Sequence, residues 1–156
     1  VIYIDRDDFR EIPDTKFQRL TKTNPVGLKY ANIKIKVTQV IKKDDVVVEL
    51  DCEKINDDTP VKFIHWVSED SPVVEVRLYE HLFKSEDPMS VEGDWRDDLN
   101  ENSKIIMKNA RVEKSISNSQ VYDHYQFERV GYFVVDEDSK PDSLVFNRIF
   151  KLKASY

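Results

Sequence analysis

Apolar and polar residues alternate along most of the 156-residue chain with a period of two. This period is typical of strands that bury one face, because successive side chains of a strand point to opposite sides. In residues 32–40, Ile33 and Ile35 fall on one face and Lys34 and Lys36 on the other. The pattern, rich in β-branched and aromatic residues, predicts strands over Asn32–Val40, Val46–Cys52, Val61–Val67, Val73–Tyr79, Lys104–Val112, Val121–Arg129, Tyr132–Asp136 and Leu144–Lys153.

Helical periodicity is weak throughout, and turn-forming residues separate the predicted strands. Short helical turns are expected only near residues 5–10, 78–84 and 94–99. The acidic stretch 85–102 contains Pro88 and Gly93 and is expected to be a long surface loop. Many short strands with a turn every ten or so residues predict an all-β chain of antiparallel β-barrels with few short helical turns. The length suits one ordinary domain or two small barrels.

Composition indicates a folded chain with a heavily solvated surface. Hydrophobic residues make up 40 % and charged residues 35 %, and 17 aromatic residues supply large apolar groups for a core. No apolar run approaches the roughly 20 residues needed to span a bilayer, and no secretory signal is visible, so no membrane partner is expected. Because residues 1–4 read as the interior of a strand, the chain is expected to be a fragment of a longer protein.

The candidate chemistry of the chain is sparse. Cys52 is the only cysteine, so no intrachain disulfide can form, and its place in an apolar alternation predicts a small buried side chain. One cysteine and three isolated histidines do not have the spacing of a metal site. Three widely spaced glycines cannot build a phosphate loop, and the paired carboxylates fall in turn-like settings. The chain itself is therefore expected to be non-catalytic and to hold no metal or cofactor.

Two segments combine cations, amides and aromatic rings, which are the groups that hold unpaired bases. One runs from Lys16 to Leu20, with Lys22 and Lys29 following, and the other is 125–129. Strand alternation places Tyr125, Phe127 and Arg129 on one face and Gln126 on the other. A solvated strand face is the alternative interpretation. The net charge of −6 argues against general coating of nucleic acid, and no DNA partner is expected, but a local basic face is allowed because screening acts over about 10 Å.

The segment Ile4-Asp5-Arg6-Asp7-Asp8-Phe9-Arg10-Glu11 resembles a sequence found in glutaminyl-tRNA synthetases. The resemblance is collinear over nearly the whole chain, which is identified as a C-terminal anticodon-binding region of the eukaryotic cytosolic type. It weakens in the polar stretches 42–60, 85–97 and 115–122. The further matching segments are 63–68, 75–79, 98–100, 126–133 and 145–148.

The resemblance implies two β-barrels that hold an anticodon loop. Residues 16–68 would form the distal barrel, and residues 1–15 with 69–156 the proximal barrel, truncated at its N-terminal side. The implied partners are the anticodon loop of tRNA(Gln) and an upstream catalytic domain of the same protein. That domain, absent here, would attach glutamine to tRNA with ATP and Mg in the cytoplasm during protein synthesis.

The resemblance also assigns roles to single residues. Arg19 would read a guanine at the last anticodon position, since its planar fork can donate to O6 and N7 together. Gln126 and Arg129 would line the pocket of the middle uracil, whose edge requires both a donor and an acceptor. Lys29 would lie near the first base, and Lys16 and Gln18 belong to the same binding segment as Arg19.

The sequence departs from the bacterial pattern at two of these positions. Gly27 stands where bacterial members have a second arginine, and Gln18 replaces a lysine. The segment Val26-Gly27-Leu28 resembles eukaryotic cytosolic members instead.

Two alternative functions stay open. The anticodon-binding domain of a glutamyl-tRNA synthetase would share the barrels but read a different third base, although the segments 63–68 and 126–133 favour glutamine. The other alternative is a stand-alone β-barrel module that binds a basic protein through its acidic surface.

Overall fold

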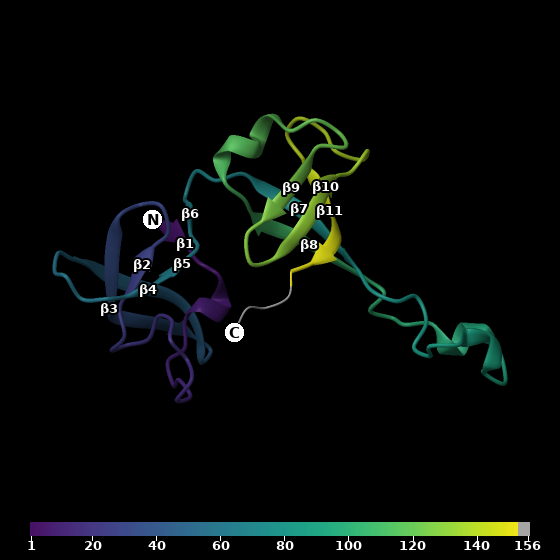
Figure 1. Ribbon diagram of the computed structural model, residues 1–156, viewed down its shortest axis with the longest axis horizontal. Helices are drawn as coiled ribbons and strands as arrows, with labels where there is room; N and C mark the ends of the chain where they lie inside the picture. Colours follow the sequence, from purple (N-terminus) through teal and green to yellow (C-terminus); the bar gives the residue numbers. More distant parts are fainter. Residues whose placement is uncertain (153–156) are drawn as a thin grey trace. The chain divides into compact units, whose positions relative to one another are not determined.

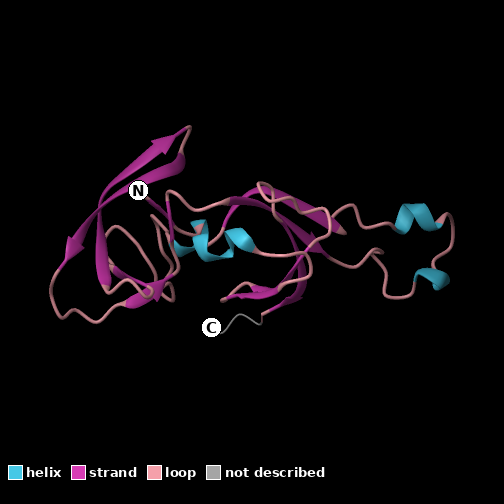
Figure 2. Ribbon diagram, turned by 90° about the horizontal axis from the view of Figure 1, so that it is seen from above, coloured by secondary structure: helices cyan, strands magenta, loops and turns pink. Residues whose placement is uncertain are grey.

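The computed structural model describes residues 1–152 and is built mainly of strands and loops (Figure 2). Three of its short helical turns begin after an aspartate, Asp5, Asp87 or Asp94, whose carboxylate accepts a backbone N–H of the first turn. The all-β fold class is confirmed. Helical structure in the described part is confined to the 3-10 segments η1 (Arg6–Asp8), η2 (Pro88–Ser90), η3 (Trp95–Asp98) and η4 (Lys114–Asn118).

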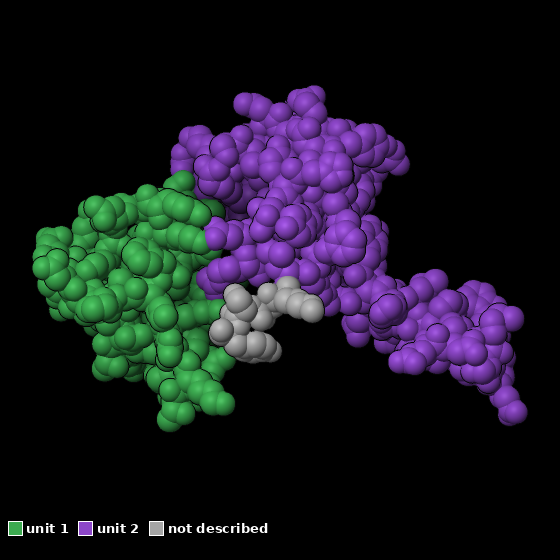
Figure 3. All heavy atoms as spheres, in the orientation of Figure 1, with its two compact units in different colours: residues 1–69 green, residues 70–156 purple. Residues whose placement is uncertain are grey.

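The chain divides into two compact units, Val1–Glu69 and Asp70–Tyr156 (Figures 1 and 3). Residues 1–15 lie in the first unit, which differs from the predicted assignment of this segment to residues 69–156. Strand β1 (Ile2–Tyr3) pairs antiparallel with β6 (Val67–Ser68), and the Leu20 N–H donates to the Asp8 carbonyl oxygen at 3.0 Å. These long-range hydrogen bonds fix the segment, and no local pattern in the sequence reveals them.

The first unit contains a four-stranded sheet with the order β4-β3-β2-β5. Its strands are β2 (Val26–Leu28), β3 (Ile33–Lys43), β4 (Val46–Ile55) and β5 (Lys62–Ile64). The turn between β3 and β4 holds Asp44 and Asp45 at φ angles of 51° and 62°. Two successive positive φ angles suit a tight hairpin whose twist matches that of its strands. Strand β2 pairs antiparallel with β3 and parallel with β5, so the sheet is mixed, not purely antiparallel as predicted.

The period-two pattern assigns the two faces of this sheet. Val26, Leu28, Ile35 and Ile64 are buried and form a core cluster with Leu20. The intervening residues point to the opposite face, where Gly27 lies beside Lys34 of β3 and Phe63 of β5. We call this second side, defined by Gly27, Lys34, Lys36 and Phe63, the outer face.

The second unit contains a five-stranded sheet with the order β8-β7-β11-β10-β9. Strand β11 runs parallel to β7 and antiparallel to β10, so this sheet is mixed as well. Its core includes the fully buried Phe133 and Phe146, and the ring of Phe127 lies 4.6 Å from that of Phe133 between centroids. The strands are β7 (Val73–Tyr79), β8 (Lys104–Arg111), β9 (His124–Phe127), β10 (Gly131–Val135) and β11 (Val145–Lys151).

Residues 80–103 form an arm between β7 and β8 that extends from the sheet (Figure 1). The two sides of the arm are joined by backbone hydrogen bonds, including Asn100 N–H to the Leu82 oxygen at 2.8 Å. The Asp98 side chain is buried, and its carboxylate accepts both the backbone N–H and the hydroxyl of Ser85. The predicted surface loop 85–102 therefore has internal order. The turn predicted at 78–84 is absent there, because strand β7 continues through Tyr79.

The predicted strands are present, but several have different bounds. Residues 61–67 break into β5 and β6, and the predicted strand 121–129 shortens to His124–Phe127. Lys153, at the end of the last predicted strand, lies outside the described residues. Among residues 1–152, no recorded ladder joins the two edge strands of either sheet, so closure into barrels stays a prediction. Cys52 is exposed on the edge strand β4, contrary to the expected burial.

No helical segment in the described range has the length and apolar character needed to cross a membrane.

Replacing Phe146 by alanine should lower the free energy of unfolding of the second unit by about 3–5 kcal/mol, because a fully buried ring leaves a cavity. Phe150 lies on the same strand but is 68 % exposed, so Phe150→Ala should cost about 1 kcal/mol or less. Chemical denaturation followed by circular dichroism measures both. Equal losses for the two variants would contradict this assignment of the core.

Candidate nucleic-acid interface

The six predicted contact residues fall into two groups on different units. Lys16, Gln18, Arg19 and Lys29 belong to the first unit, and Gln126 and Arg129 to the second. Lys16, Gln18 and Arg19 are neighbours on one segment, Lys29 follows β2, and Gln126 and Arg129 belong to the β9–β10 hairpin.

Arg19 is held by a buried carboxylate. Its Nη1 lies 2.9 Å from Oδ1 of Asp8, whose side chain is fully buried, while the Arg19 side chain is 41 % exposed. The same nitrogen donates to the Asp7 carbonyl oxygen at 3.5 Å. Asp8 is itself fixed, because its N–H donates to the Asp5 carbonyl and its own carbonyl accepts the Leu20 N–H. The arginine is thus anchored at one nitrogen and reaches solvent with the rest of its head group.

This anchoring leaves donors for a ligand. A guanidinium carries five N–H groups in a planar fork. The ion pair of Arg19 with Asp8 and its hydrogen bond to the Asp7 carbonyl oxygen both use Nη1. The edge formed by Nε and Nη2 therefore carries two parallel donors of the kind that pair with guanine O6 and N7. A positioned side chain loses less conformational entropy on binding than a free one.

Residues 14–17 form a tight loop before Arg19. The Asp14 carboxylate accepts the Lys16 backbone N–H at 2.9 Å and pairs with the Arg10 guanidinium at 2.5 Å. The Arg10 head group in turn lies 4.6 Å above the ring of Phe17. Lys16 and Gln18 are exposed on this loop. Local hydrogen bonds thus fix the backbone while the Lys16 and Gln18 side chains remain accessible.

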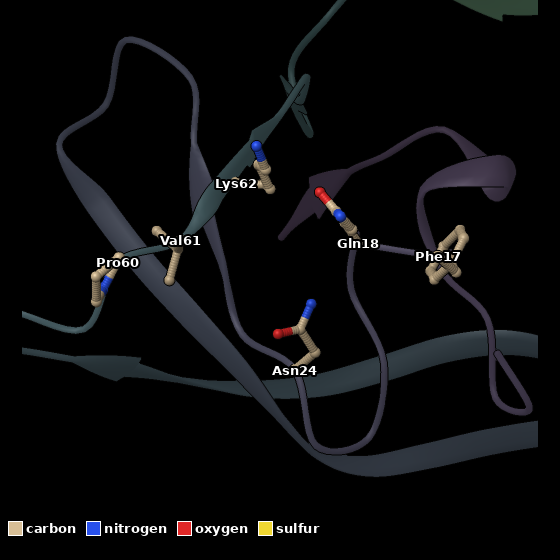
Figure 4. Close-up of a pocket in the computed structure, with 6 residues that line it drawn as sticks. All are labelled: Phe17, Gln18, Asn24, Pro60, Val61 and Lys62. Atoms are coloured by element: carbon tan, nitrogen blue, oxygen red, sulfur yellow. The ribbon is translucent and has the colours of Figure 1, made fainter. Parts of the chain in front are cut away.

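A hollow of about 430 Å³ lies beside this loop (Figure 4). Gln18, Asn24 and Lys62 provide amide and ammonium groups, and apolar side chains provide the rest of the wall. The Asn24 amide also donates to the Arg19 carbonyl oxygen at 2.8 Å, which links the hollow to the arginine. Amide and ammonium groups beside an aromatic ring and apolar carbon suit a nucleobase, which has polar edges and an aromatic face. The lining residues are Phe17, Gln18, Asn24, Pro60, Val61 and Lys62.

Sequence reasoning missed Asn24, Pro60, Val61 and Lys62. Residues 23–25 and 57–60 are turn-forming in the sequence, and Val61 and Lys62 begin the predicted strand 61–67, so none of them is marked as a contact residue. The parallel pairing of β5 with β2 carries residues 61 and 62 to this hollow. Pairing between distant strands leaves no signal in a single sequence, so residues 60–62 could not have been identified. The one available signal was the amide of Asn24, which lies close in sequence to the predicted segment 16–20.

The predicted cation Lys22 shares a protein partner with Lys42 of β3. Lys22 pairs with Glu11 at 2.7 Å, and Lys42 pairs with the other oxygen of the same carboxylate at 2.5 Å. The hydrogen bond from Lys22, followed by that from Lys42, holds the pKa of Glu11 below its usual value. Lys29 lies with its ammonium 5.3 Å from the centre of the Tyr30 ring, which is 86 % exposed. The Lys29 carbonyl oxygen accepts the indole N–H of Trp66 at 2.9 Å, which fixes this part of the backbone.

Gln126 and Arg129 occupy the hairpin between β9 and β10. Tyr125 and Phe127 point into the core, as the alternation predicts, and Gln126 points to solvent opposite Tyr132. Arg129 does not share the face of the two aromatic residues, because the strand ends at Phe127. It lies in the turn with a φ of 68° and an exposed side chain. Gln126 and Arg129 are thus both exposed near the end of this hairpin.

A glycine closes the same hairpin. A Cβ atom at Gly131 would overlap the backbone carbonyl oxygen of Phe150 in β11, so this position admits glycine alone without a backbone shift. The close approach of β10 and β11 sets the position of the turn that carries Arg129.

Within residues 1–152, no three side chains of the His, Cys, Asp and Glu types gather in an arrangement that could hold a metal ion. The exposed polar groups of the Lys16–Arg19 segment and of the β9–β10 hairpin are hydrogen-bond donors and acceptors of the kind that contact nucleobases and phosphates.

Comparison with known proteins yields one family and several close relatives. The family described as "tRNA synthetases class I (E and Q), anti-codon binding domain" matches residues 63–136. The chain is 44 % identical over 160 residues to a probable glutamine–tRNA ligase of Dictyostelium discoideum, covering 98 % of this chain and 20 % of that protein. It is 41 % identical over 167 residues to the cytoplasmic glutamine–tRNA ligase of Arabidopsis thaliana, covering 100 % of this chain and 21 % of that protein.

A third relative is the glutamine–tRNA ligase of Bos taurus, which is 40 % identical over 160 residues, covering 97 % of this chain and 20 % of that protein. The chain therefore spans about a fifth of the length of the curated relatives it matches.

Arg19→Ala should destabilise the first unit by about 1–3 kcal/mol, because it removes the Arg19 guanidinium from its ion pair with the buried Asp8 carboxylate. Arg10→Ala is the matched control: the Arg10–Asp14 pair is half-exposed on both sides and should contribute about 1 kcal/mol or less. Urea denaturation compares the two variants. If Arg19→Ala costs no more than Arg10→Ala, Asp8 does not depend on this arginine.

Proposed function

This chain belongs to the anticodon-binding domains of class I tRNA synthetases for glutamate and glutamine, and on that premise we propose that it reads the anticodon loop of tRNA(Gln). The observation that carries the proposal is Arg19, anchored by Asp8, on the same segment whose Phe17 and Gln18 line a hollow suited to a nucleobase. A rigid arginine with one free fork is suited to sequence reading, whereas a flexible lysine would supply charge alone.

In this proposal the Arg19 region and the β9–β10 hairpin each contact a different base of the anticodon. Arg19 pairs with the guanine at the last position, supported by the exposed Gln18 and Lys16. Gln126 and Arg129, near the end of the β9–β10 hairpin, contact the middle uracil, where an amide can both donate and accept. Lys29 lies near the first base. Each role rests on the resemblance for its assignment and on exposure and geometry for its feasibility.

The chain would act as the reading part of a larger enzyme. We propose that a catalytic domain elsewhere in the same protein joins glutamine to tRNA with ATP and Mg. The exposed Arg19 region and the β9–β10 hairpin would position the tRNA for that step by binding its anticodon end. The Arabidopsis relative is described as cytoplasmic, and the same compartment is proposed for this protein.

Arg19→Lys should shrink the preference for guanine at the last anticodon position by about 1–3 kcal/mol, because an ammonium lacks the planar fork. The lysine keeps a cation near Asp8 and so limits the folding defect expected of the alanine variant. The measurement is kcat/KM of aminoacylation by the full-length enzyme on tRNA(Gln) and on transcripts with one anticodon base changed.

Gln126→Ala and Arg129→Ala should reduce discrimination at the middle base, while Asp97→Asn, on the arm, should change neither preference. If Arg19→Lys lowered kcat/KM equally for every anticodon, Arg19 would be a phosphate contact and its base-reading role would be wrong. If wild-type enzyme preferred a glutamate anticodon, the glutamyl-tRNA synthetase alternative would replace the proposal.

Binding of the isolated chain to an anticodon stem-loop should show a shallow salt dependence. Three or four phosphate contacts give a slope of log Kobs against log salt of about −2 to −3, whereas ten contacts would give about −7. The shallow slope is expected because Lys22 and Lys42 are engaged by Glu11. Fluorescence anisotropy over a range of KCl concentrations measures it. A slope near −7 would instead reveal a broad basic surface.

A further inference from the structure

An aromatic ring lies flat on the outer face of the first unit's sheet. Phe63 of β5 is paired with Gly27 of β2, and its ring covers the backbone of that glycine. A Cβ atom placed on Gly27 would lie 2.5 Å from Cε1 and 2.6 Å from Cδ1 of Phe63, inside van der Waals contact. The absence of a side chain at residue 27 is therefore what allows the ring to lie down on the strand.

The Phe63 ring is 56 % exposed, although the next residue, Ile64, is fully buried. Strand alternation explains this difference, since Ile64 points into the core and Phe63 to the outer face. One face of the Phe63 ring packs on the backbone of Gly27, and the opposite face is exposed to solvent. The result is an exposed aromatic ring at the end of a row of paired residues that continues through Gly27 and Lys34 to Ile55.

Two lysines of β3, Lys34 and Lys36, lie on the same outer face as the Phe63 ring. Lys34 lies directly across Gly27 on β3, and its ammonium donates to the carbonyl oxygens of Asp57 and Thr59 at 2.7 and 2.8 Å. Lys36 follows two residues later and pairs with Glu53 of β4 at 2.7 Å. Both ammonium groups are thus held in place on the outer face. The charge of Lys36 is balanced by Glu53, whereas Lys34 donates to carbonyl oxygens and keeps its positive charge for an anionic strand that crosses this face.

We propose that Phe63, supported by Gly27, is a stacking platform for an unpaired base of the bound RNA. The inference rests on the proposed function only in taking RNA as the ligand. Single-stranded nucleic acid is held by aromatic faces on which bases stack, beside cations that follow the phosphates, and the outer face has both. Along the row of paired residues the ring is followed by Gly27 and then Lys34, so an ammonium group is present on the same face to contact a phosphate.

Stacking differs from base reading in its consequences. Every base has a π-face, so loss of the ring should weaken binding of all anticodon loops by a similar factor. Phe63→Leu in the full-length enzyme should raise the Kd for an anticodon stem-loop about tenfold, while Phe63→Trp should retain wild-type affinity. The indole introduced by Phe63→Trp should also be quenched on RNA binding, beyond the quenching seen in wild-type enzyme.

Gly27→Ala tests the position of the ring without removing it. The added Cβ must push the Phe63 ring off the strand, so this variant should weaken binding to a degree similar to Phe63→Leu. Phe150→Leu is the matched control, because Phe150 is also exposed but lies on β11 of the second unit. It should leave the Kd unchanged.

The outcomes separate the stacking role from a structural one and from the proposed function itself. If Phe63→Leu lowers the unfolding midpoint but leaves the Kd unchanged, the ring merely covers a strand glycine and the stacking proposal is wrong. The same conclusion follows if the introduced indole is not quenched. If wild-type enzyme shows no preference for the glutamine anticodon, the proposed function fails whatever Phe63 does. Both proposals are supported if Phe63→Leu raises the Kd about tenfold for every anticodon and the preference for guanine at the last anticodon position is unchanged.

Discussion

The buried carboxylate of Asp8 determines how the first unit holds together at its binding edge. It lies within a segment that, apart from the two-residue strand β1, belongs to no sheet, yet it is fully buried and pairs with Arg19 across a short loop. An ionised carboxylate taken out of water needs a cation and hydrogen bonds, so the loop cannot move away from it without a large loss of free energy. The backbone bonds between Asp8 and Leu20 add to this coupling. The residue proposed to read a base is therefore also a structural one.

The sheet of the first unit buries few side chains. Its core is small, with five buried residues, so most of its strand surface faces solvent. Period-two alternation then gives the sheet an outer face that is available for binding, and the tight Gly27 position lets an aromatic ring lie on it. In the second unit the aromatic residues of β9 are used for the core instead, and the polar residue between them, Gln126, is the one that reaches solvent.

Charge is distributed unevenly along the chain. Residues 85–102, within the arm, hold seven acidic residues and one basic residue, which accounts for the net charge of −6 of the whole chain. The remaining residues are neutral in sum, so an RNA need not approach a uniformly negative protein. Several cations near the proposed interface are balanced by carboxylates such as Glu11 and Glu53. Recognition here depends on a few placed groups more than on overall attraction.

The sequence alone determined the all-β class, most of the strands and the family. Alternation and motif matches are local properties of the chain, so they can be identified without knowing which residues are in contact. It also identified Arg19, Gln126 and Arg129 as candidates, although their roles remain proposals. Only the tertiary structure showed that residues 1–15 pack with the first unit and that Asp8 anchors Arg19. Only the tertiary structure brought residues 61 and 62 beside Gln18 and laid Phe63 over Gly27. These features depend on hydrogen bonds between strands distant in the chain, and one sequence does not encode such pairing in any local pattern.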